Sequence, residues 1–140
     1  MLERIGRYEV LERIGSGSQG TVYRARDPEL DRVVAIKVVH PHLKDDAGYI
    51  ETLRREASLG ARLQHPNITA INDIQLDGED PFIVMEYFPT TLSDRMKVGE
   101  PLSWSDAVAI SIQVARALQH AHDNRVVHRD IRPGNILLRE

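Results

Sequence analysis

The spacing of apolar residues changes once along this chain, and that change constrains the fold more than any other feature. Five segments alternate apolar and polar residues or carry β-branched and aromatic residues, as strands do: 8–14, 21–26, 32–39, 69–76 and 81–87. Apolar residues recur at helical spacing from Ile50 to Ala61, and Asp46 precedes them as a capping residue. The pattern predicts an α+β fold in which five strands accompany one main helix, which ends at about Leu63.

From residue 92 onward the period is helical. We expect a short helix over 92–98 and a longer one that runs to about Asp123. Ser103 and Asp106 have the spacing of a capping box at the start of the longer helix, with Asp in place of the usual Glu. This helix is apolar on more than one side, so we expect it to be buried. Residues 88–91 show no clear period and are interpreted as a linker between lobes at 1–87 and 88–140.

Composition and net charge limit the kinds of molecule that the chain is expected to bind. The chain has 140 residues, the size of one domain, and a net charge of −3, which gives no support for a nucleic-acid or membrane surface. The absence of cysteine excludes disulfides and thiolate metal sites. No apolar run is long enough to cross a membrane, and the first residues lack a signal-peptide pattern, so we expect a cytoplasmic location.

A glycine-rich segment, Gly15-Ser16-Gly17-Ser18-Gln19-Gly20, separates the first two predicted strands. Glycines permit positive φ and a close approach of the backbone, so its N–H groups could contact a polyphosphate. A flexible hairpin is the plainer alternative. A dinucleotide-binding turn would require a helix directly after the glycines, whereas residues 21–23 have the pattern of a strand.

Lys37 lies inside the strongly apolar strand predicted at 32–39. A lysine is costly to bury unless an anion pairs with it. Glu56, 19 residues later on the predicted helix, could supply that anion and hold Lys37 toward a phosphate. The alternatives are a lysine that reaches water at the strand edge and a solvated Glu56.

A polar cluster, His128-Arg129-Asp130-Ile131-Arg132-Pro133-Gly134-Asn135, lies between two apolar segments near the end of the sequence. Asp130 could accept a proton from a hydroxyl, Arg132 could neutralise phosphate charge, and Asn135 could bind a hard cation through its amide oxygen. Taken singly, each is more often a surface residue.

Together and in this order, these motifs resemble the eukaryotic-like serine/threonine protein kinases of bacterial type. The resemblance rests on Gly15 to Val22, on Val34-Ala35-Ile36-Lys37, on Glu56, and on the segment from His128 to Asn135. It covers essentially the whole chain but only the N-terminal portion of a kinase domain. It implies an antiparallel five-stranded N-lobe with one main helix, followed by the first helices and the catalytic loop of an incomplete C-lobe.

The resemblance also implies ATP and Mg²⁺ as cofactors, and a protein with Ser or Thr hydroxyls as substrate. Asp130 would be the catalytic base, Asn135 would hold one magnesium, and Arg132, Lys37 and Glu56 would support catalysis. ATP would contact the following residues: Ile14, Gly15, Ser16, Gly17, Ser18, Gln19, Gly20, Thr21, Val22, Ala35, Lys37, Met85, Glu86, Phe88 and Leu137.

Several positions depart from the family's pattern. Arg132 stands where lysine is usual, and Gly60 occupies a helix position at which Gly costs about 1 kcal/mol relative to Ala. No Asp-Phe-Gly follows Asn135 in this sequence. We therefore expect the piece to be inactive alone, and two alternatives stay open: a nucleotide-binding half-kinase without catalysis, and a regulatory module that associates with another kinase chain.

Overall fold

The computed structural model describes residues 3–97, 99, 101–126 and 131–139. Within them, the chain divides into two compact units. Residues 1–62 and 70–87 form the first unit, and residues 63–69 and 88–140 form the second. None of the described helices is long and apolar enough to span a membrane.

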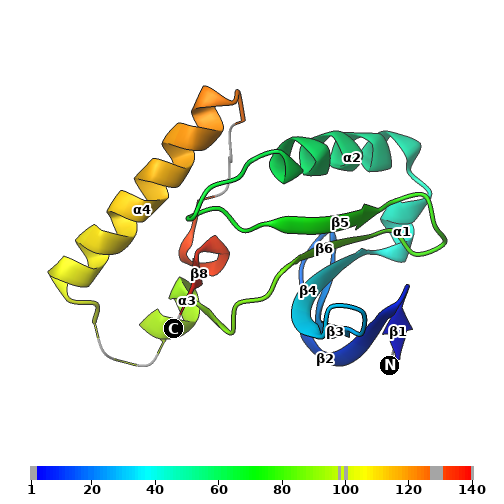
Figure 1. The fold of residues 1–140 in the computed structure, drawn as a ribbon, viewed down its shortest axis with the longest axis horizontal. Coiled ribbons are helices and arrows are strands. Elements are labelled where there is room, and N and C mark those ends of the chain that lie inside the picture. The colour runs from blue at the N-terminus through cyan, green and yellow to red at the C-terminus, as the bar shows by residue number, and fades with distance from the viewer. Residues whose placement is uncertain (1–2, 98, 100, 127–130, 140) are drawn as a thin grey trace. The chain divides into compact units, whose positions relative to one another are not determined.

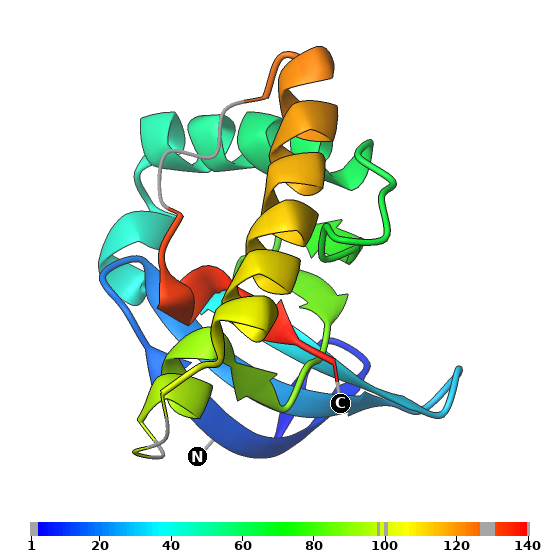
Figure 2. The same cartoon turned by 90° about the vertical axis from the view of Figure 1, so that its left-hand side faces the viewer.

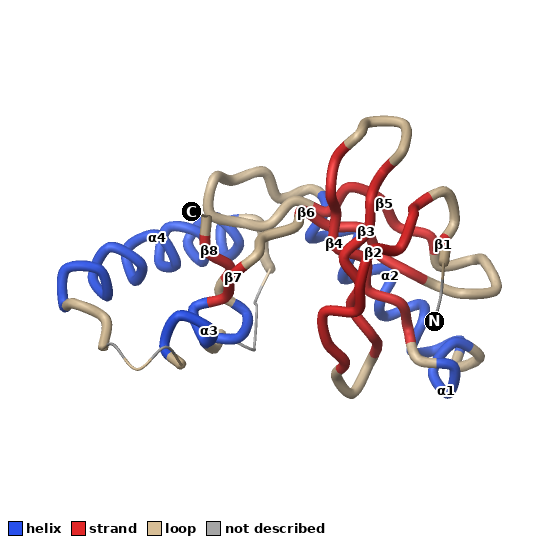
Figure 3. The backbone as a smooth tube through the Cα atoms, turned by 90° about the horizontal axis from the view of Figure 1, so that it is seen from below, coloured by secondary structure: helices blue, strands red, loops and turns tan. Residues whose placement is uncertain are grey.

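The first unit is built on an antiparallel sheet with strand order β1-β2-β3-β4-β6-β5, drawn in red in Figure 3. Its strands are β1 (Arg4–Ile5), β2 (Tyr8–Ser16), β3 (Gly20–Asp27), β4 (Arg32–Val39), β5 (Ile71–Gln75) and β6 (Phe82–Glu86). The five strands predicted from alternation are confirmed, and the short β1 adds a sixth among the described residues. The two-residue β1 is too short to show alternation in the sequence.

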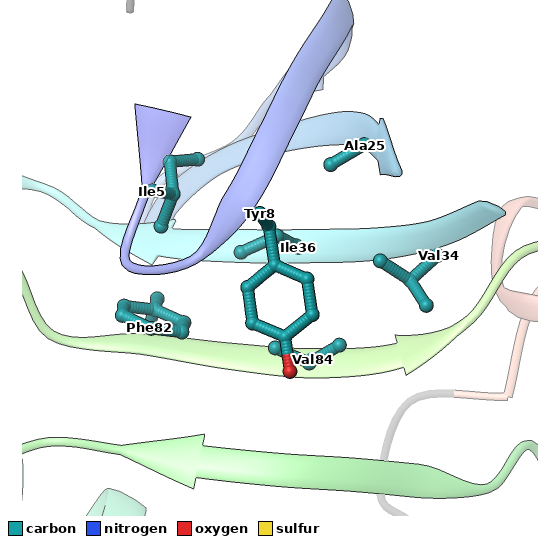
Figure 4. Close-up of a cluster of buried hydrophobic side chains, with 7 residues drawn as sticks. All are labelled: Ile5, Tyr8, Ala25, Val34, Ile36, Phe82 and Val84. Carbon is teal, nitrogen blue, oxygen red and sulfur yellow. The ribbon is translucent and has the colours of Figure 1, made fainter. Parts of the chain in front are cut away.

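One face of the sheet carries the larger apolar core of this unit. Alternate residues of β3, β4 and β6 point to this face, because side chains along a strand alternate between the two sides. The core contains Ile5, Tyr8, Ala25, Val34, Ile36, Phe82 and Val84 (Figure 4). Ala25, Ile36 and Val84 are completely buried. The rings of Tyr8 and Phe82 meet edge to face with centroids 6.3 Å apart, a favoured aromatic geometry.

The opposite face is partly covered by α2 (Ala47–Ala61), which lies along β5 and β6 in Figure 1. Its buried Ala57 packs with Leu76 and Ile83. The Asp46 side chain accepts a hydrogen bond from Tyr49 N at 3.0 Å, so the predicted N-cap is confirmed. The helix ends at Ala61, two residues before the predicted end, and the short α1 (Pro41–Lys44) precedes it.

The second unit contains α3 (Leu92–Met96), α4 (Trp104–Asp123), the 3₁₀ turn η1 (Pro133–Asn135) and the strand pair β7 (Thr90–Thr91) and β8 (Leu137–Leu138). Both helices begin where expected, and the predicted cap of α4 is confirmed. Thr91 and Asp94 exchange hydrogen bonds as a capping box, and Ser103 Oγ accepts from Asp106 N at 3.1 Å. The expected linker at 88–91 instead ends in a paired strand.

The expectation that α4 is buried is wrong. Trp104 is 80% exposed, and Val108 and Ile112 are each 46% exposed. These three residues follow one another at intervals of four and therefore line one side of the helix. Among the described residues of α4, Ala121 alone is buried. The helix has more apolar surface than its own unit covers.

Candidate phosphate-binding site

The glycine-rich segment forms a tight hairpin between β2 and β3. Gly17 N–H donates to Gly20 O at 2.9 Å, which leaves Ser18 and Gln19 at the tip. A Cβ on Gly20 would overlap the carbonyl oxygen of Val38 in β4, whereas a Cβ on Gly15 or Gly17 would meet nothing within 4 Å. Glycine at position 20 therefore allows β3 to lie close to β4. At positions 15 and 17 it leaves open space beside the backbone.

The hairpin glycines do not use the positive φ that glycine permits. Among the described residues, positive φ at glycine occurs only at Gly6 and Gly99. The hairpin turns without left-handed backbone at a glycine, and two β-bulges interrupt β2 before the tip. The bulges skip Leu11 and Ile14 in the pairing with β3.

Lys37 lies on β4 beneath this hairpin. It pairs with Val22 of β3 on one side and Ile83 of β6 on the other, so the three side chains share the face that α2 partly covers. The side chain is half-buried, and its Nζ donates to Gln19 Oε1 at 3.4 Å. Burial lowers the pKa of Lys37, and the charge of Glu56 opposes that shift.

The anticipated ion pair between Lys37 and Glu56 is not formed in this structure. Glu56 is exposed on α2 and influences Lys37 through its charge, whereas Lys37 Nζ donates a hydrogen bond to Gln19. Lys37 is therefore held by the tip of the glycine-rich hairpin rather than by the helix.

Three of the apolar residues expected to contact ATP lie on the same face of the sheet as Lys37. Ala35 pairs with Met85 across β4 and β6, and Val22 lies on the next strand. All three are half-buried. Ile14 is 49% exposed because it is the extra residue of a bulge. The structure thus gathers these four expected residues around the hairpin in one unit.

Glu86 ends β6, where it lies opposite Val34 of β4 and forms two hydrogen bonds with Ala70. Its backbone N–H donates to Ala70 O at 3.0 Å, and its carboxylate accepts from Ala70 N at 2.8 Å. These two bonds fix the course of the chain just before the first unit ends at Tyr87.

The remaining expected site residues belong to the second unit. Thr90 and Thr91 pair with Leu138 and Leu137, so the segment that follows Phe88 runs beside the end of the chain (Figure 2). The guanidinium of Arg139 lies 5.3 Å from the centre of the Phe88 ring, a cation–π distance.

Backbone hydrogen bonds hold residues 132–136, which precede β8. Asn135 N donates to Arg132 O at 2.9 Å, and Leu92 N donates to Ile136 O at 2.8 Å. Asp130, the expected base, lies outside the described residues. Arg132 and Asn135 are thus placed on one short turn, next to the start of α3.

The described residues include no group of three or more His, Cys, Asp or Glu side chains that could hold a metal. Asn135 would supply a single amide oxygen. An amide oxygen is a ligand that suits Mg²⁺, which keeps several waters and usually takes its other ligands from carboxylates and substrate phosphates.

Sequence reasoning missed His40, which contacts the hairpin tip twice. Its backbone N–H donates to Gln19 O at 3.0 Å, and its Nε2 lies 2.6 Å from Gly17 O. No local pattern in the sequence indicates this contact, because it follows from the register of the two strands. In the β3–β4 pairing, Asp27 lies opposite Arg32 and Gly20 opposite Val39. Continuing that register places residue 40 opposite residue 19.

Comparison with known proteins now places the chain in a family. Residues 8–140 match the model of the protein kinase domain. The chain is 42% identical over 134 residues to the serine/threonine-protein kinase PrkC of Bacillus subtilis and 39% identical over 137 residues to PknD of Mycobacterium tuberculosis. These matches cover 95% and 96% of the chain, but 21% and 20% of PrkC and PknD.

Solved structures agree with this placement. The kinase domain of Mycobacterium tuberculosis PknI superposes with a TM-score of 0.79 at 31% identity, over 96% of this chain and 56% of the PknI chain. The chain belongs to the protein kinase domain family, and its relatives include bacterial serine/threonine kinases. It spans about a fifth of the length of the curated relatives it matches.

Proposed function

We propose that this chain is the nucleotide-binding part of a serine/threonine protein kinase, which transfers a phosphoryl group from ATP to a protein hydroxyl. One observation carries the proposal: the half-buried ammonium of Lys37 lies beneath a glycine-rich hairpin and is bonded to its tip. A desolvated cation next to an open backbone loop is an arrangement suited to polyphosphate.

The space around the hairpin fits a nucleotide. Positions 15 and 17 have open space on the side where a Cβ would stand, so phosphate oxygens can approach the backbone there. Val22, Ala35 and Met85 present apolar surface on the same face as Lys37. A purine would pack on that apolar surface. The Lys37 ammonium would then bond to a phosphate instead of to Gln19.

In the second unit, Asn135 would hold Mg²⁺ with the phosphates, and Arg132 would neutralise phosphate charge. Bound Mg²⁺ would offset the charge that develops on the transferred group. Asp130 would accept the proton of the Ser or Thr hydroxyl and orient its oxygen toward the γ-phosphorus. Alignment and charge neutralisation would supply most of the catalysis. We place this activity in the cytoplasm.

Thermal unfolding of the chain with saturating ATP, with and without Mg²⁺, tests the binding part of the proposal. We expect ATP to raise the midpoint, because a ligand that binds only the folded state stabilises it. Lys37→Met should abolish most of that rise. Phosphoryl transfer from labelled ATP to a general protein substrate tests the second part. An unchanged midpoint in wild type under both conditions would refute nucleotide binding.

A second candidate is a module that binds nucleotide without transferring phosphate. The separation of Lys37 from Glu56 favours it, because Lys37 is then not held by the helix in the way that transfer is expected to require. It predicts a thermal shift with ATP that does not need Mg²⁺ and no labelled product. Labelled product that depends on Asp130 would exclude it.

A further inference from the structure

His40 reaches the hairpin tip from the end of β4. Its Nε2 lies 2.6 Å from Gly17 O, and its backbone N–H donates to Gln19 O at 3.0 Å. A carbonyl oxygen can only accept a hydrogen bond, so Nε2 must carry the hydrogen. The neutral imidazole is therefore in its Nε2–H form, and the imidazolium can make the same bond.

This bond fixes the orientation of one peptide group in the tip. The peptide unit is planar and trans, so the Gly17 carbonyl and the Ser18 N–H point in opposite directions. When His40 holds the carbonyl, the Ser18 N–H is aimed away from the imidazole. A peptide in a glycine-rich tip would otherwise rotate with little steric cost.

Lys37 on β4 and His40, the residue after β4, both bond to the hairpin tip. Besides the two bonds from His40, Lys37 Nζ donates to Gln19 Oε1 at 3.4 Å. The Lys37 bond is long, and any phosphate would compete for it. The short bond from His40 involves neither the Lys37 ammonium nor the Ser18 N–H, so it can persist when a phosphate binds.

We propose that His40 is a positioning residue that holds the Gly17–Ser18 peptide of the glycine-rich hairpin in the orientation that receives nucleotide phosphate. This inference rests on the nucleotide binding proposed above. Without the side-chain bond, the tip would have to be ordered when the nucleotide binds, and the affinity would fall by the cost of that ordering.

Affinity for a fluorescent ATP analogue in the presence of Mg²⁺, measured by anisotropy on the whole chain, tests the inference. His40→Leu removes the donor and keeps the backbone N–H bond to Gln19. We expect it to weaken binding by roughly 3- to 10-fold, the range of one ordinary hydrogen bond. His40→Gln retains an N–H donor and should recover at least half of that loss.

His42 supplies the matched control. Its ring stacks on His40 with centroids 5.6 Å apart, and His42→Leu should leave the affinity within about 2-fold of wild type, well below one hydrogen bond. Equal affinity for wild type and His40→Leu would overturn the inference. So would equal losses in His40→Leu and His40→Gln, because the donor would then not matter.

A second readout separates this inference from the proposed function. Long-range proton–nitrogen NMR of the free chain reports which imidazole nitrogen carries the hydrogen. We expect Nε2–H for neutral His40, and a shift of the Ser18 amide resonance in His40→Leu but not in His42→Leu. An Nδ1–H form would overturn the inference. Failure of wild type to bind nucleotide, together with the expected NMR result, would refute the proposed function and leave the His40–Gly17 bond established.

Discussion

Substitution of single glycines in the hairpin should separate two roles that the motif combines. A Cβ on Gly20 would overlap the Val38 carbonyl oxygen and lie 3.1 Å from the Val38 carbonyl carbon. Backbone atoms cannot rotate away as a side chain can, so β3 and β4 would have to separate. Overpacking in a filled site costs about 1–3 kcal/mol, and we expect Gly20→Ala to lie in the upper half of that range.

The matched controls are Gly15→Ala and Gly17→Ala. Neither Cβ would meet an atom within 4 Å, and neither residue has positive φ. Alanine at a compatible position stabilises by about 0.4–1 kcal/mol, because it restricts the unfolded chain. We therefore expect these two variants to match or slightly exceed the stability of wild type.

Urea unfolding followed by far-UV circular dichroism measures the three free energies of unfolding. Amide exchange at Val38 and Lys37 should quicken in Gly20→Ala, because the β3–β4 ladder is the part that must move. A Gly20→Ala protein within about 0.5 kcal/mol of wild type, the range of a neutral surface change, would refute the reasoning. So would a Gly17→Ala variant as unstable as Gly20→Ala.

Three further changes test other parts of the structure. Lys37→Met removes a half-buried ammonium group. Burial lowers the pKa of Lys37, although the charge of Glu56 opposes that shift, so the variant should unfold at the same or higher urea concentration than wild type. Because the folded pKa lies below the unfolded value of 10.5, the wild type gains stability as pH rises toward 10.5, and the difference between the proteins should shrink. Gly60→Ala should stabilise by less than about 1 kcal/mol in thermal unfolding, because helix propensity improves while the new Cβ lies 3.2 Å from the movable Cδ1 of Ile71; clear destabilisation would contradict this. Burial raises the pKa of Asp27, but hydrogen bonds from the Arg7 guanidinium and two backbone N–H groups outweigh it and hold the pKa below 3.8. The stability that this carboxylate contributes is therefore present above pH 3.8 and lost as pH falls through the lower folded value, and Asp27→Asn should flatten that acid limb of the pH profile.

Much of the first unit could be predicted because its signals are local. Alternation identified five strands, and Asp46 identified the start of α2. The turn at residues 27–31 follows from Asp27, whose side chain accepts from Glu29 N and Leu30 N. The motifs also placed Lys37 next to the glycine-rich hairpin, where the structure has it.

Features that depend on strand register or on a balance of neighbours could not be predicted from local pattern. Nothing in the composition of residues 8–16 predicts the bulges at which Leu11 and Ile14 are exposed. The role of Gly20 depends on how closely β4 approaches, which sequence spacing does not give. The predicted ion pair between Lys37 and Glu56 was wrong. Opposite charges predict attraction, but the sequence does not show whether α2 lies close enough to β4 for the two side chains to meet.

The second unit shows the same limit. The cap of α4 was predicted, because it depends on two residues three apart, and the start of α3 followed from the change to a helical period. The burial of α4 was not, because apolar content on a helix indicates what could be covered rather than what its neighbours cover. Pairing of β7 with β8 joins segments more than forty residues apart, a distance at which two-residue strands carry no recognisable pattern.

The central claim is that Lys37 and the glycine-rich hairpin bind the phosphates of a nucleotide. Isothermal titration of wild type and Lys37→Met with ATP and with adenosine, both in the presence of Mg²⁺, tests it most directly. We predict that the substitution weakens ATP binding by at least 10-fold, consistent with the loss of a charged hydrogen bond, and leaves adenosine binding unchanged. Equal losses for ATP and adenosine, or no loss for either, would contradict the claim.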